Sequence, residues 1–389
     1  MRVLIVAAAD PARHTGGAER VAACLAEGLG HEHEVTVLSL ADEAPDPGPV
    51  PWTRLTVPLQ APYHPAEAEG ASIVEQGVWH VKELHGEGMR DRLDRALAET
   101  GPFDVASVHN IQGLGFGVFD ALAAHGIATV YTAHDFKLAS PVLNRRPEGI
   151  GRVAAALEPA YQAWVRRRTR SLDRVVTPSR YLGRELVDEG VVEPDELAIV
   201  PNGVPTDVDH VLDSPDPRLT MYGALAEHKG VLAFVEAFAA SSADLDLDVA
   251  GTGPLAEEIQ AITETDPRID HLGFVDEEQL ATQVANSLAT VVPSRWPENC
   301  PMVVLESLAA GTPVVHTARG GLAEICPPGE LGVRLPEHPV DWNDAIETLN
   351  EERLIAMRPR CRKVAEQRYS VPRMVEAYEH QFRDVTGGS

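Results

Sequence analysis

The sequence predicts an α/β protein built from two doubly wound parallel sheets with helices on their faces. Short apolar runs, which suit buried strands, alternate with stretches of helical periodicity, and this alternation is typical of parallel βαβ units. The alternation starts a second time near residue 219. The chain has 389 residues, which is more than one hydrophobic core usually holds, so two domains are expected.

The first half opens on a continuous apolar run at residues 3–7, which predicts a buried strand. Gly16 and Gly17 form a loop, and residues 18–29 have apolar side chains at helical spacing. Residues 42–65 are rich in proline and show little periodicity, so they are predicted to be a surface connection. The further strands expected in this half are residues 35–38, 105–109, 128–132 and 174–177.

The second half repeats the pattern after a predicted hinge at residues 207–217, which contain prolines and several aspartates. A helix is expected at residues 230–240. The strands expected here are residues 219–223, 245–250, 269–272, 289–292 and 313–316. The last amphipathic segment, residues 371–385, is expected to be a separate helix.

The domains predicted from this pattern are two Rossmann-like units at residues 1–205 and 206–370, followed by a carboxyl-terminal helix within residues 371–389. Ligands of open parallel sheets bind beyond the carboxyl ends of the strands. A cleft between the two halves is therefore the expected binding site.

Composition narrows the function classes. The formal net charge of −26 argues against general nucleic-acid binding, because phosphate contacts need a basic surface. No apolar run approaches the roughly 20 residues that a spanning helix needs, and no signal-peptide pattern is present, so a cytoplasmic protein is expected. The four cysteines are widely spaced, which argues against a disulfide framework and against a zinc site.

The most informative segment is residues 293–306, PSRWPENCPMVVLE, in which seven residues separate Glu298 from Glu306. Pro301 suits the first position of a helix that continues from Met302, because its missing N–H is harmless there. Glu298 and Glu306 would then lie near a helix N-terminus, which attracts anions. Two carboxylates that bind hydroxyl groups and a helix end that binds phosphate together suit a nucleotide sugar.

This segment, with AAGTPVV at residues 309–315 and GGLAE at residues 320–324, resembles the retaining glycosyltransferases of family 4, which have the GT-B fold. The alternative is an ordinary amphipathic helix with solvated glutamates at its ends. The apolar neighbours of Glu306 argue against that alternative, since they are a poor setting for an unpartnered charge. The resemblance covers nearly the whole chain.

The resemblance implies roles for residues in both halves. Gly16 and Gly17 match the family's amino-terminal glycine loop, whose backbone approaches the donor phosphate or the acceptor. His134 follows a predicted strand where the family carries an active-site histidine. Asn202 belongs to the family's Asn-Gly turn. The loops that contain Gly251 and Gly273 are also assigned to donor binding by the resemblance. Ordinary turns would explain these two loops equally well.

Two departures from the family pattern bear on donor binding. Lys229 matches the family's lysine and should pair with the donor diphosphate, but Ala224 replaces the usual arginine. Arg295 or Arg319 could supply the missing cation. Asn299, Cys300 and Pro301 replace the common Gly-Phe-Gly, and the backbone N–H groups of Asn299 and Cys300 are expected to reach sugar hydroxyls.

The implied activity is retaining transfer of a sugar from a nucleotide-diphosphate sugar to an acceptor hydroxyl in glycan, polysaccharide or glycolipid synthesis, with no cofactor and no metal. Lys229 and the helix at Met302 would stabilise the leaving diphosphate. Glu298 would orient the sugar, Glu306 would bind the ribose, and His134 would face the transferred sugar. Three alternatives stay open: a GT-B epimerase, a phosphorylase, and a non-catalytic nucleotide-sugar binder. An oxidoreductase is less favoured, because no GxGxxG follows the first strand.

An arginine-rich stretch interrupts the acidic composition. Ten arginines lie between Arg145 and Arg184, against three acidic residues. Leu157, Tyr161, Trp164 and Val165 form an apolar stripe that precedes three consecutive arginines at residues 166–168. Such a helix could rest on an anionic membrane or receive a lipid-linked acceptor. The favoured alternative is a solvated helix whose stripe packs inward.

Overall fold

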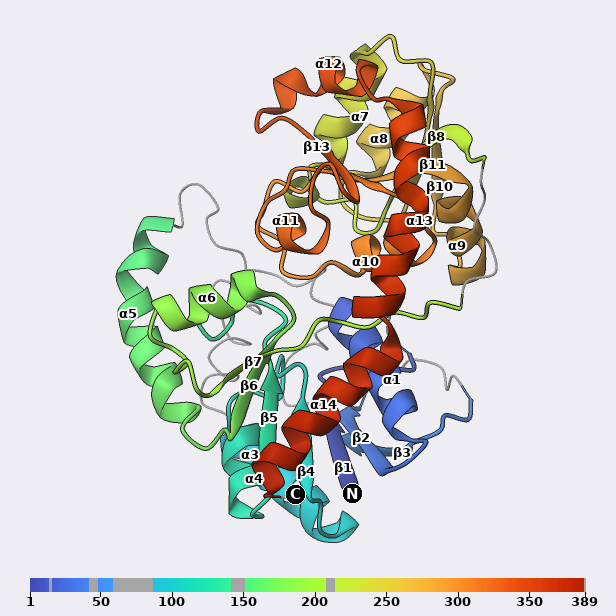
Figure 1. Cartoon of the computed structure of the whole chain (residues 1–389). Coiled ribbons are helices and arrows are strands. Elements are labelled where there is room, and N and C mark those ends of the chain that lie inside the picture. The colour runs from blue at the N-terminus through green and yellow to red at the C-terminus, as the bar shows by residue number, and fades with distance from the viewer. Residues whose placement is uncertain (14–15, 42–47, 59–86, 141–150, 208–213, 388–389) are drawn as a thin grey trace. The chain divides into compact units, whose positions relative to one another are not determined.

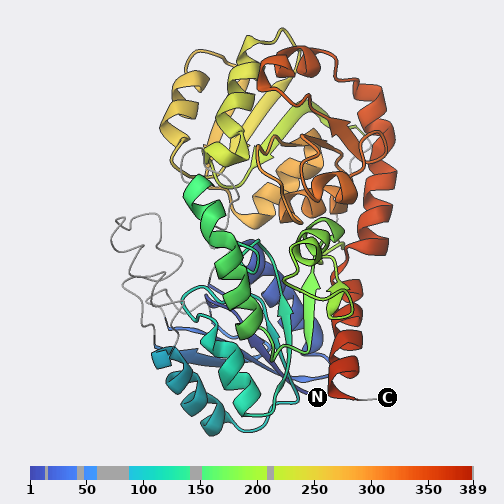
Figure 2. The same cartoon turned by 90° about the vertical axis from the view of Figure 1, so that its left-hand side faces the viewer.

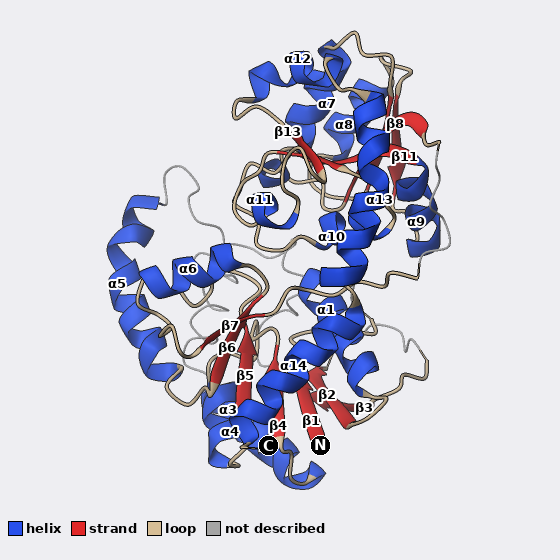
Figure 3. Ribbon diagram, in the orientation of Figure 1, coloured by secondary structure: helices blue, strands red, loops and turns tan. Residues whose placement is uncertain are grey.

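The computed structural model of the chain describes residues 1–13, 16–41, 48–58, 87–140, 151–207 and 214–387 (Figure 1). The chain forms two compact units, the first from Met1–Pro201 with Val371–Ser389 and the second from Asn202–Ser370. Each unit has a single sheet in which every described strand pair is parallel. Figure 3 shows each sheet between layers of helices. The predicted doubly wound parallel sheets are confirmed.

The sheet of the first unit has the order β3-β2-β1-β4-β5-β6-β7. Its order reverses between β1 and β4, which pair directly with Val3 opposite Val105. Buried apolar residues on both faces explain why β1 and β4 lie at the centre. The strands are β1 (Arg2–Val6), β2 (Glu34–Leu40), β3 (Thr53–Val57), β4 (Val105–Val108), β5 (Ala128–Thr132), β6 (Arg174–Thr177) and β7 (Leu197–Ile199).

Both edge strands of this sheet were missing from the sequence prediction. β3 lies within residues 42–65, which were predicted to be a surface connection, so that prediction is wrong for Thr53–Val57. Only Val57 of β3 is buried, because an edge strand has one neighbour and keeps polar residues toward water. β7 has three residues, none of them buried. β3 therefore lacks the apolar run that marks a central strand, whereas β7 is apolar but only three residues long.

The helices of the first unit pack on both faces of its sheet. α1 packs against α14, and α14 also packs against β5, while α3 and α4 pack together. The carboxyl-terminal helix α14 thus belongs to the first unit, where its Tyr378 and Phe382 are fully buried. The helices are α1 (Gly17–Leu29), α3 (Glu87–Thr100), α4 (Gly117–Ala124), α5 (Gly151–Arg168), α6 (Arg180–Asp188) and α14 (Val371–Thr386).

The arginine-rich helix α5 turns its apolar stripe toward the core. Val165 is fully buried, Tyr161 donates a hydrogen bond of 2.6 Å to the Lys137 carbonyl, and the Trp164 ring lies edge-on to Phe116 at 4.9 Å. The end of α5 meets α4, where Arg168 pairs with Asp120 at 2.9 Å (Figure 2). The inward-packing alternative is therefore confirmed for these three residues; residues 145–146 and the Leu157 side chain lie outside the described part.

The sheet of the second unit has the order β10-β9-β8-β11-β12-β13, which reverses between β8 and β11. The short edge strand β13 was not predicted. Of the predicted hinge, residues 208–213 lie outside the described part, and the first strand already begins at Asp216. The strands are β8 (Asp216–Tyr222), β9 (Asp246–Ala250), β10 (Ile269–Gly273), β11 (Ser287–Val292), β12 (Val314–His316) and β13 (Gly332–Arg334).

The helices of the second unit form two groups. α7 packs on α8 and α12, whereas α10 packs on α13 and α9. No helix in the described ranges is long and apolar enough to cross a membrane. The helices are α7 (Val231–Ala240), α8 (Ala256–Thr263), α9 (Glu277–Asn286), α10 (Met302–Ala309), α11 (Leu322–Ile325), α12 (Trp342–Glu347) and α13 (Glu351–Arg368), with short 3-10 turns η2 (Glu227–Lys229) and η3 (Pro339–Asp341).

Candidate functional site

Lys229 and Glu298 meet in the second unit at the switch point of its sheet, which is the place where the strand order reverses between β8 and β11. Lys229 ends the turn η2 after β8, and Glu298 lies in the loop after β11. Because the strand order reverses between β8 and β11, the loops that follow these strands lie where ligands of open α/β sheets usually bind. The Lys229 Nζ atom lies 2.8 Å from Glu298 Oε1. The structure thus brings two of the predicted catalytic residues into direct contact.

The Glu298 carboxylate is held from both sides. Ser294 donates a second hydrogen bond to Glu298 Oε1 at 2.7 Å. The Glu298 side chain is 14% exposed and that of Lys229 is 36% exposed, so the pair is accessible without being fully solvated. Such a setting strengthens the attraction of Lys229 for an anion relative to bulk water.

Gly230 explains how the two loops come so close. It has a positive φ of 70°, and a Cβ atom at this position would collide with the Pro293 carbonyl oxygen. Glycine is therefore required both for the backbone conformation and for the close approach. The backbone contact continues where Arg295 N–H donates to the His228 carbonyl at 2.9 Å.

A third loop, residues 317–321 after β12, supports Glu298 from behind. Gly321 N–H donates to the Glu298 carbonyl at 2.7 Å, and Thr317 Oγ1 donates to the Ser294 carbonyl at 2.7 Å. Ala318 has a φ of 55°, an uncommon value for a residue other than glycine. Its N–H donates to His316 Nδ1 at 3.0 Å, which stabilises this strained turn.

The second carboxylate, Glu306, lies on α10. The Tyr222 hydroxyl is 3.1 Å from Glu306 Oε2 and 3.0 Å from the Val303 carbonyl oxygen. Pro301 was predicted to occupy the first helical position, but it immediately precedes the helix with an extended ψ of 126°. This prediction was wrong by one residue, because Pro301 supplies the carbonyl that accepts the first turn's hydrogen bond from Val304.

The residues between the two glutamates are largely buried. Asn299, Cys300 and Met302 are at most 9% exposed. The Asn202 amide donates to the Cys300 carbonyl at 3.2 Å, so the predicted Asn-Gly turn supports this loop through its side chain. Burial raises the pKa of the Cys300 thiol to about 12, which keeps it protonated and unreactive at neutral pH.

Arg295 and Arg319, the two candidates to replace the missing family arginine, lie side by side. Arg319 donates to the Arg295 carbonyl at 2.9 Å, and Arg295 pairs with Glu227 at 3.3 Å. The Arg295 side chain is 51% exposed. Arg295 therefore lies on the loop that carries Glu298, and Arg319 lies on the neighbouring third loop, after β12.

Gly251 directly follows β9, and Gly273 is the last residue of β10. Both glycines lie at the same edge of the sheet. Gly251 N–H donates to the Gly273 carbonyl at 2.7 Å. Gly251 has a φ of 138°, and a Cβ atom there would collide with the Gly223 carbonyl oxygen. The structure thus brings the two predicted loops together next to the end of β8.

Sequence reasoning missed the stacking of His228 on Trp296, whose ring centroids are 4.3 Å apart. These residues are the chain neighbours of Lys229 and Arg295. Burial and the nearby Lys229 lower the pKa of His228. The stack ties η2 to the loop after β11, and no spacing rule reveals such a contact between separate loops.

The remaining predicted residues belong to the first unit. Gly16 precedes α1 and Gly17 begins it, and Glu19 in its first turn accepts a hydrogen bond of 3.3 Å from Asn110, which follows β4. His134 follows β5 and stacks on His109 with ring centroids 5.4 Å apart. Burial lowers the pKa of His134 to about 4, so its imidazole is neutral at pH 7.

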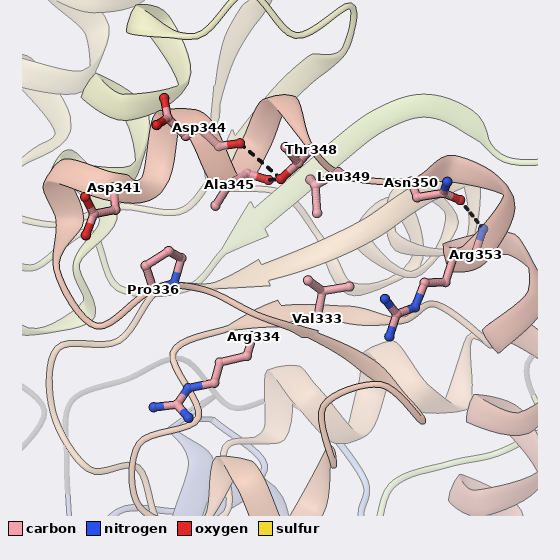
Figure 4. Close-up of a pocket in the computed structure, with 10 residues that line it drawn as sticks. All are labelled: Val333, Arg334, Pro336, Asp341, Asp344, Ala345, Thr348, Leu349, Asn350 and Arg353. Atoms are coloured by element: carbon pink, nitrogen blue, oxygen red, sulfur yellow. Dashed lines mark hydrogen bonds between the residues drawn. The ribbon is translucent and has the colours of Figure 1, made fainter.

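A separate cavity of about 420 Å³ lies between β13 and α12, lined among others by Arg334, Asp344 and Arg353 (Figure 4). None of the predicted site residues lines it. The hydrogen bonds drawn among its lining residues are local to the helix ends: Thr348 Oγ1 donates to the Asp344 carbonyl, and Arg353 N–H donates to Asn350 Oδ1. The switch point of the second sheet is therefore the better candidate site.

Two parallel Rossmann-like sheets, each with a reversal of strand order, define the GT-B class. The family model for glycosyl transferases group 1 matches residues 206–368, and the model for glycosyltransferase family 4 matches residues 15–208. The chain belongs to glycosyltransferase family 4.

Relatives and solved structures agree with this family. The MMP alpha-(1->4)-mannosyltransferase of Mycolicibacterium hassiacum is 26% identical over 66% of this chain and 64% of its own length. A D-inositol 3-phosphate glycosyltransferase of Pseudarthrobacter chlorophenolicus is 29% identical over 46% of this chain and 48% of its own.

Two solved structures share the fold over both whole chains. Sucrose-phosphate synthase of Thermosynechococcus elongatus has a TM-score of 0.77 at 18% identity, with 100% of each chain covered. HepE of Anabaena, solved with UDP and glucose, has a TM-score of 0.72 at 15% identity, with 99% of this chain and 100% of its own covered.

Proposed function

We propose that the protein transfers a sugar from a nucleotide-diphosphate sugar to an acceptor hydroxyl, with retention of the anomeric configuration. The observation that carries this proposal is the contact between Lys229 and Glu298 at the switch point of the second sheet. A cation beside a carboxylate supports the binding of a diphosphate and of sugar hydroxyls at one site. Membership of the family and the UDP and glucose bound to the similarly folded HepE support the same ligand class.

Lys229 is proposed to stabilise the charge that develops on the leaving diphosphate. The N-terminus of α10 would add unpaired backbone N–H groups and the positive end of its dipole. Electrostatic stabilisation of this kind usually accelerates an enzymatic reaction more than any other single effect. Arg295 would supply the second cation that Ala224 cannot provide.

The two glutamates are proposed to bind different parts of the donor. Glu298 would accept hydrogen bonds from the hydroxyls of the transferred sugar and orient its ring. Glu306, whose carboxylate is positioned by Tyr222, would accept hydrogen bonds from the ribose hydroxyls. The turns at Gly251 and Gly273 would let the backbone approach the base, and Asn202 would keep the Asn299–Cys300 backbone in place.

The proposed step needs no metal and no covalent enzyme intermediate. The bond between the anomeric carbon and the diphosphate oxygen breaks, and the bond to the acceptor oxygen forms on the same face of the sugar. The acceptor's proton moves to the departing phosphate oxygen, so atoms and charges balance. His134, Gly16 and Gly17 of the first unit are proposed to contribute to the sugar and acceptor side.

The acceptor is proposed to be a sugar, a lipid-linked sugar or a small polyol. The relatives named for mannosyl transfer and for D-inositol 3-phosphate favour small, hydroxyl-rich acceptors as the first to test. In the described part of α5 the apolar stripe packs inward, and exposed charges such as Arg166 and Arg167 are what it offers to an anionic membrane. A lipid-linked acceptor is therefore the less supported choice.

A thermal-shift screen against a panel of nucleotide sugars tests donor binding, because a ligand that binds only the folded state raises the melting temperature. The donor that binds is then incubated with D-inositol 3-phosphate and simple sugars, and NMR of the product gives the anomeric configuration. An inverted linkage would contradict retention. Conversion of the nucleotide sugar without any acceptor would favour an epimerase, and binding without turnover would favour a non-catalytic binder.

A further inference from the structure

A chain of three polar side chains runs inward from the half-buried His134 behind the carboxyl ends of β4 and β5. Ser107 Oγ lies 3.0 Å from His109 Nε2, and His109 Nδ1 lies 3.1 Å from His134 Nε2. Ser107 is fully buried and His109 is 2% exposed. The chain therefore connects His134, the proposed active-site histidine, to the interior of the sheet.

Helix α14 closes this chain on the inner side. The Tyr378 ring lies 5.7 Å from the His109 ring, and the Tyr378 hydroxyl is 2.8 Å from Thr132 Oγ1. Burial keeps the Tyr378 phenol neutral, because it raises the pKa of this group above the usual range. His109 is thus enclosed between the sheet and α14, where its ring cannot rotate without disturbing buried side chains.

The Ser107 hydroxyl determines which atoms donate and which accept in the hydrogen bonds from Ser107 to His109 and from His109 to His134. Within the described part of the chain, His109 Nε2 is the hydrogen-bond partner of this hydroxyl. A buried O–H without an acceptor would cost about 1–3 kcal/mol, whereas an unused lone pair on the same oxygen costs less. Ser107 therefore donates its proton to His109 Nε2.

This donor determines the tautomers of both histidines. Because His109 Nε2 accepts, the His109 proton is on Nδ1, which donates to His134 Nε2. Because His134 Nε2 accepts, the His134 proton is on Nδ1. Burial lowers the pKa of both imidazoles, so neither carries a second proton at pH 7.

We propose that Ser107 and His109 are positioning residues that fix His134 as its Nδ1–H tautomer. Any contact that the imidazole makes through Nδ1 is then made as a hydrogen-bond donor, which suits a sugar oxygen and excludes a general base at that atom. The assignment of the His134 tautomer is inferred from the hydrogen-bond geometry. Only the idea that His134 Nδ1–H donates to a sugar oxygen rests on the proposed function.

Nitrogen NMR of the whole protein labelled with ¹⁵N-histidine tests the tautomer without any substrate. Protonated and unprotonated imidazole nitrogens have well separated ¹⁵N shifts, and the His134 signals are identified by their loss in His134→Gln. The expected spectrum shows His134 with a protonated Nδ1 and an unprotonated Nε2. A protonated Nε2, or a doubly protonated ring at pH 7, overturns the proposal.

Variants of Ser107 test the positioning role. In Ser107→Ala the His134 signals should show a mixture of tautomers, and kcat should fall about three- to tenfold, the loss of one hydrogen bond, with the donor KM unchanged. Ser107→Thr keeps the hydroxyl and should restore both properties. Ser179→Ala, which removes the side-chain cap of α6 in the same unit, is matched for loss of stability and should leave the His134 spectrum unchanged.

The outcomes separate the two proposals. The predicted tautomer in a protein without transferase activity supports the assignment and contradicts the proposed function. A single His134 tautomer in wild type and in Ser107→Ala alike overturns the role of Ser107. Equal losses of kcat in Ser107→Ala and Ser107→Thr, with unchanged spectra, would show a packing effect and also overturn it.

Discussion

Lys229 and Glu298 are 69 positions apart in the sequence, and the Lys229 ammonium donates a hydrogen bond of 2.8 Å to the Glu298 carboxylate. The contact exists because Gly230 lets its own backbone touch Pro293 and because residues 317–321 support Glu298 from behind. The pair is a local consequence of strand order, since β8 and β11 are neighbours in the sheet. Its two charges are the first targets for mutation.

Replacing Lys229 with alanine should lower kcat/KM by about 100-fold, because one charge that stabilises the leaving diphosphate is removed. Initial rates with the donor found by thermal shift measure this. Lys363→Ala changes an exposed lysine on α13 and is the matched control, which should keep wild-type kinetics. Unchanged kcat/KM in Lys229→Ala would contradict the proposed phosphate contact.

Tyr222→Phe should weaken donor binding by about tenfold, because the Glu306 carboxylate loses a hydrogen bond that positions it. Isothermal titration with the donor gives the dissociation constant. Tyr369→Phe removes a buried hydroxyl elsewhere in the second unit, 3.4 Å from the Ile325 carbonyl oxygen, and should bind the donor normally. Equal losses in both variants would indicate general destabilisation.

Arg295→Ala should raise the donor KM as strongly as Lys229→Ala does, if Arg295 replaces the arginine that Ala224 lacks. Steady-state kinetics over a range of donor concentrations measure the effect. Arg360→Ala removes another exposed, ion-paired arginine and serves as the control. An unaltered KM in Arg295→Ala, together with a raised KM in Arg319→Ala, would assign the role to Arg319.

Stability should fall with acid because His316 is fully buried. Burial lowers its pKa from 6.5 to about 4 in the folded protein. Between pH 6.5 and about pH 4 the His316 imidazole is protonated in the unfolded chain but stays neutral in the folded protein. The contribution of this group to the free energy of unfolding is therefore lost as the pH falls through this range, and it does not change further below about pH 4. The loss is on the order of 3 kcal/mol for this group.

His316→Asn keeps an acceptor for the Ala318 N–H and removes the titration. Urea unfolding at pH 7 and at pH 4 should therefore show a smaller loss of unfolding free energy in the variant than in wild type. Identical pH dependence of the two proteins would show that His316 does not contribute.

The central strands could be predicted because burial on both faces favours apolar residues, as in the continuous apolar run Val3–Val6 of β1. Edge strands β3 and β13 could not, since exposure on one side mixes polar residues into three to five positions. The boundary at Pro301 was misplaced by one residue, because a proline suits both the last extended position and the first helical one.

Lys229, Glu298 and Glu306 could be selected as candidate site residues because each belongs to a short sequence pattern with a chemical meaning. The structure brings Lys229 into contact with Glu298, while the proposed roles of all three residues remain predictions. His109 and Trp296 were missed because their importance lies in contacts with residues from other loops. A Ser-x-His at the end of a buried strand was the available signal for His109, since a fully buried polar pair needs an internal partner.

Helix α14 has a consequence for the order in which the protein is made. It contributes Tyr378 and Phe382 to the core of the first unit, although it is synthesised after the whole of the second unit. The amino-terminal unit therefore cannot complete its core until α14 has been synthesised, while residues 202–370 can finish folding before it. Pulse proteolysis of stalled nascent chains that expose residues up to Ser370, but not α14, outside the ribosome should find the later-made unit resistant and the earlier-made one still digestible.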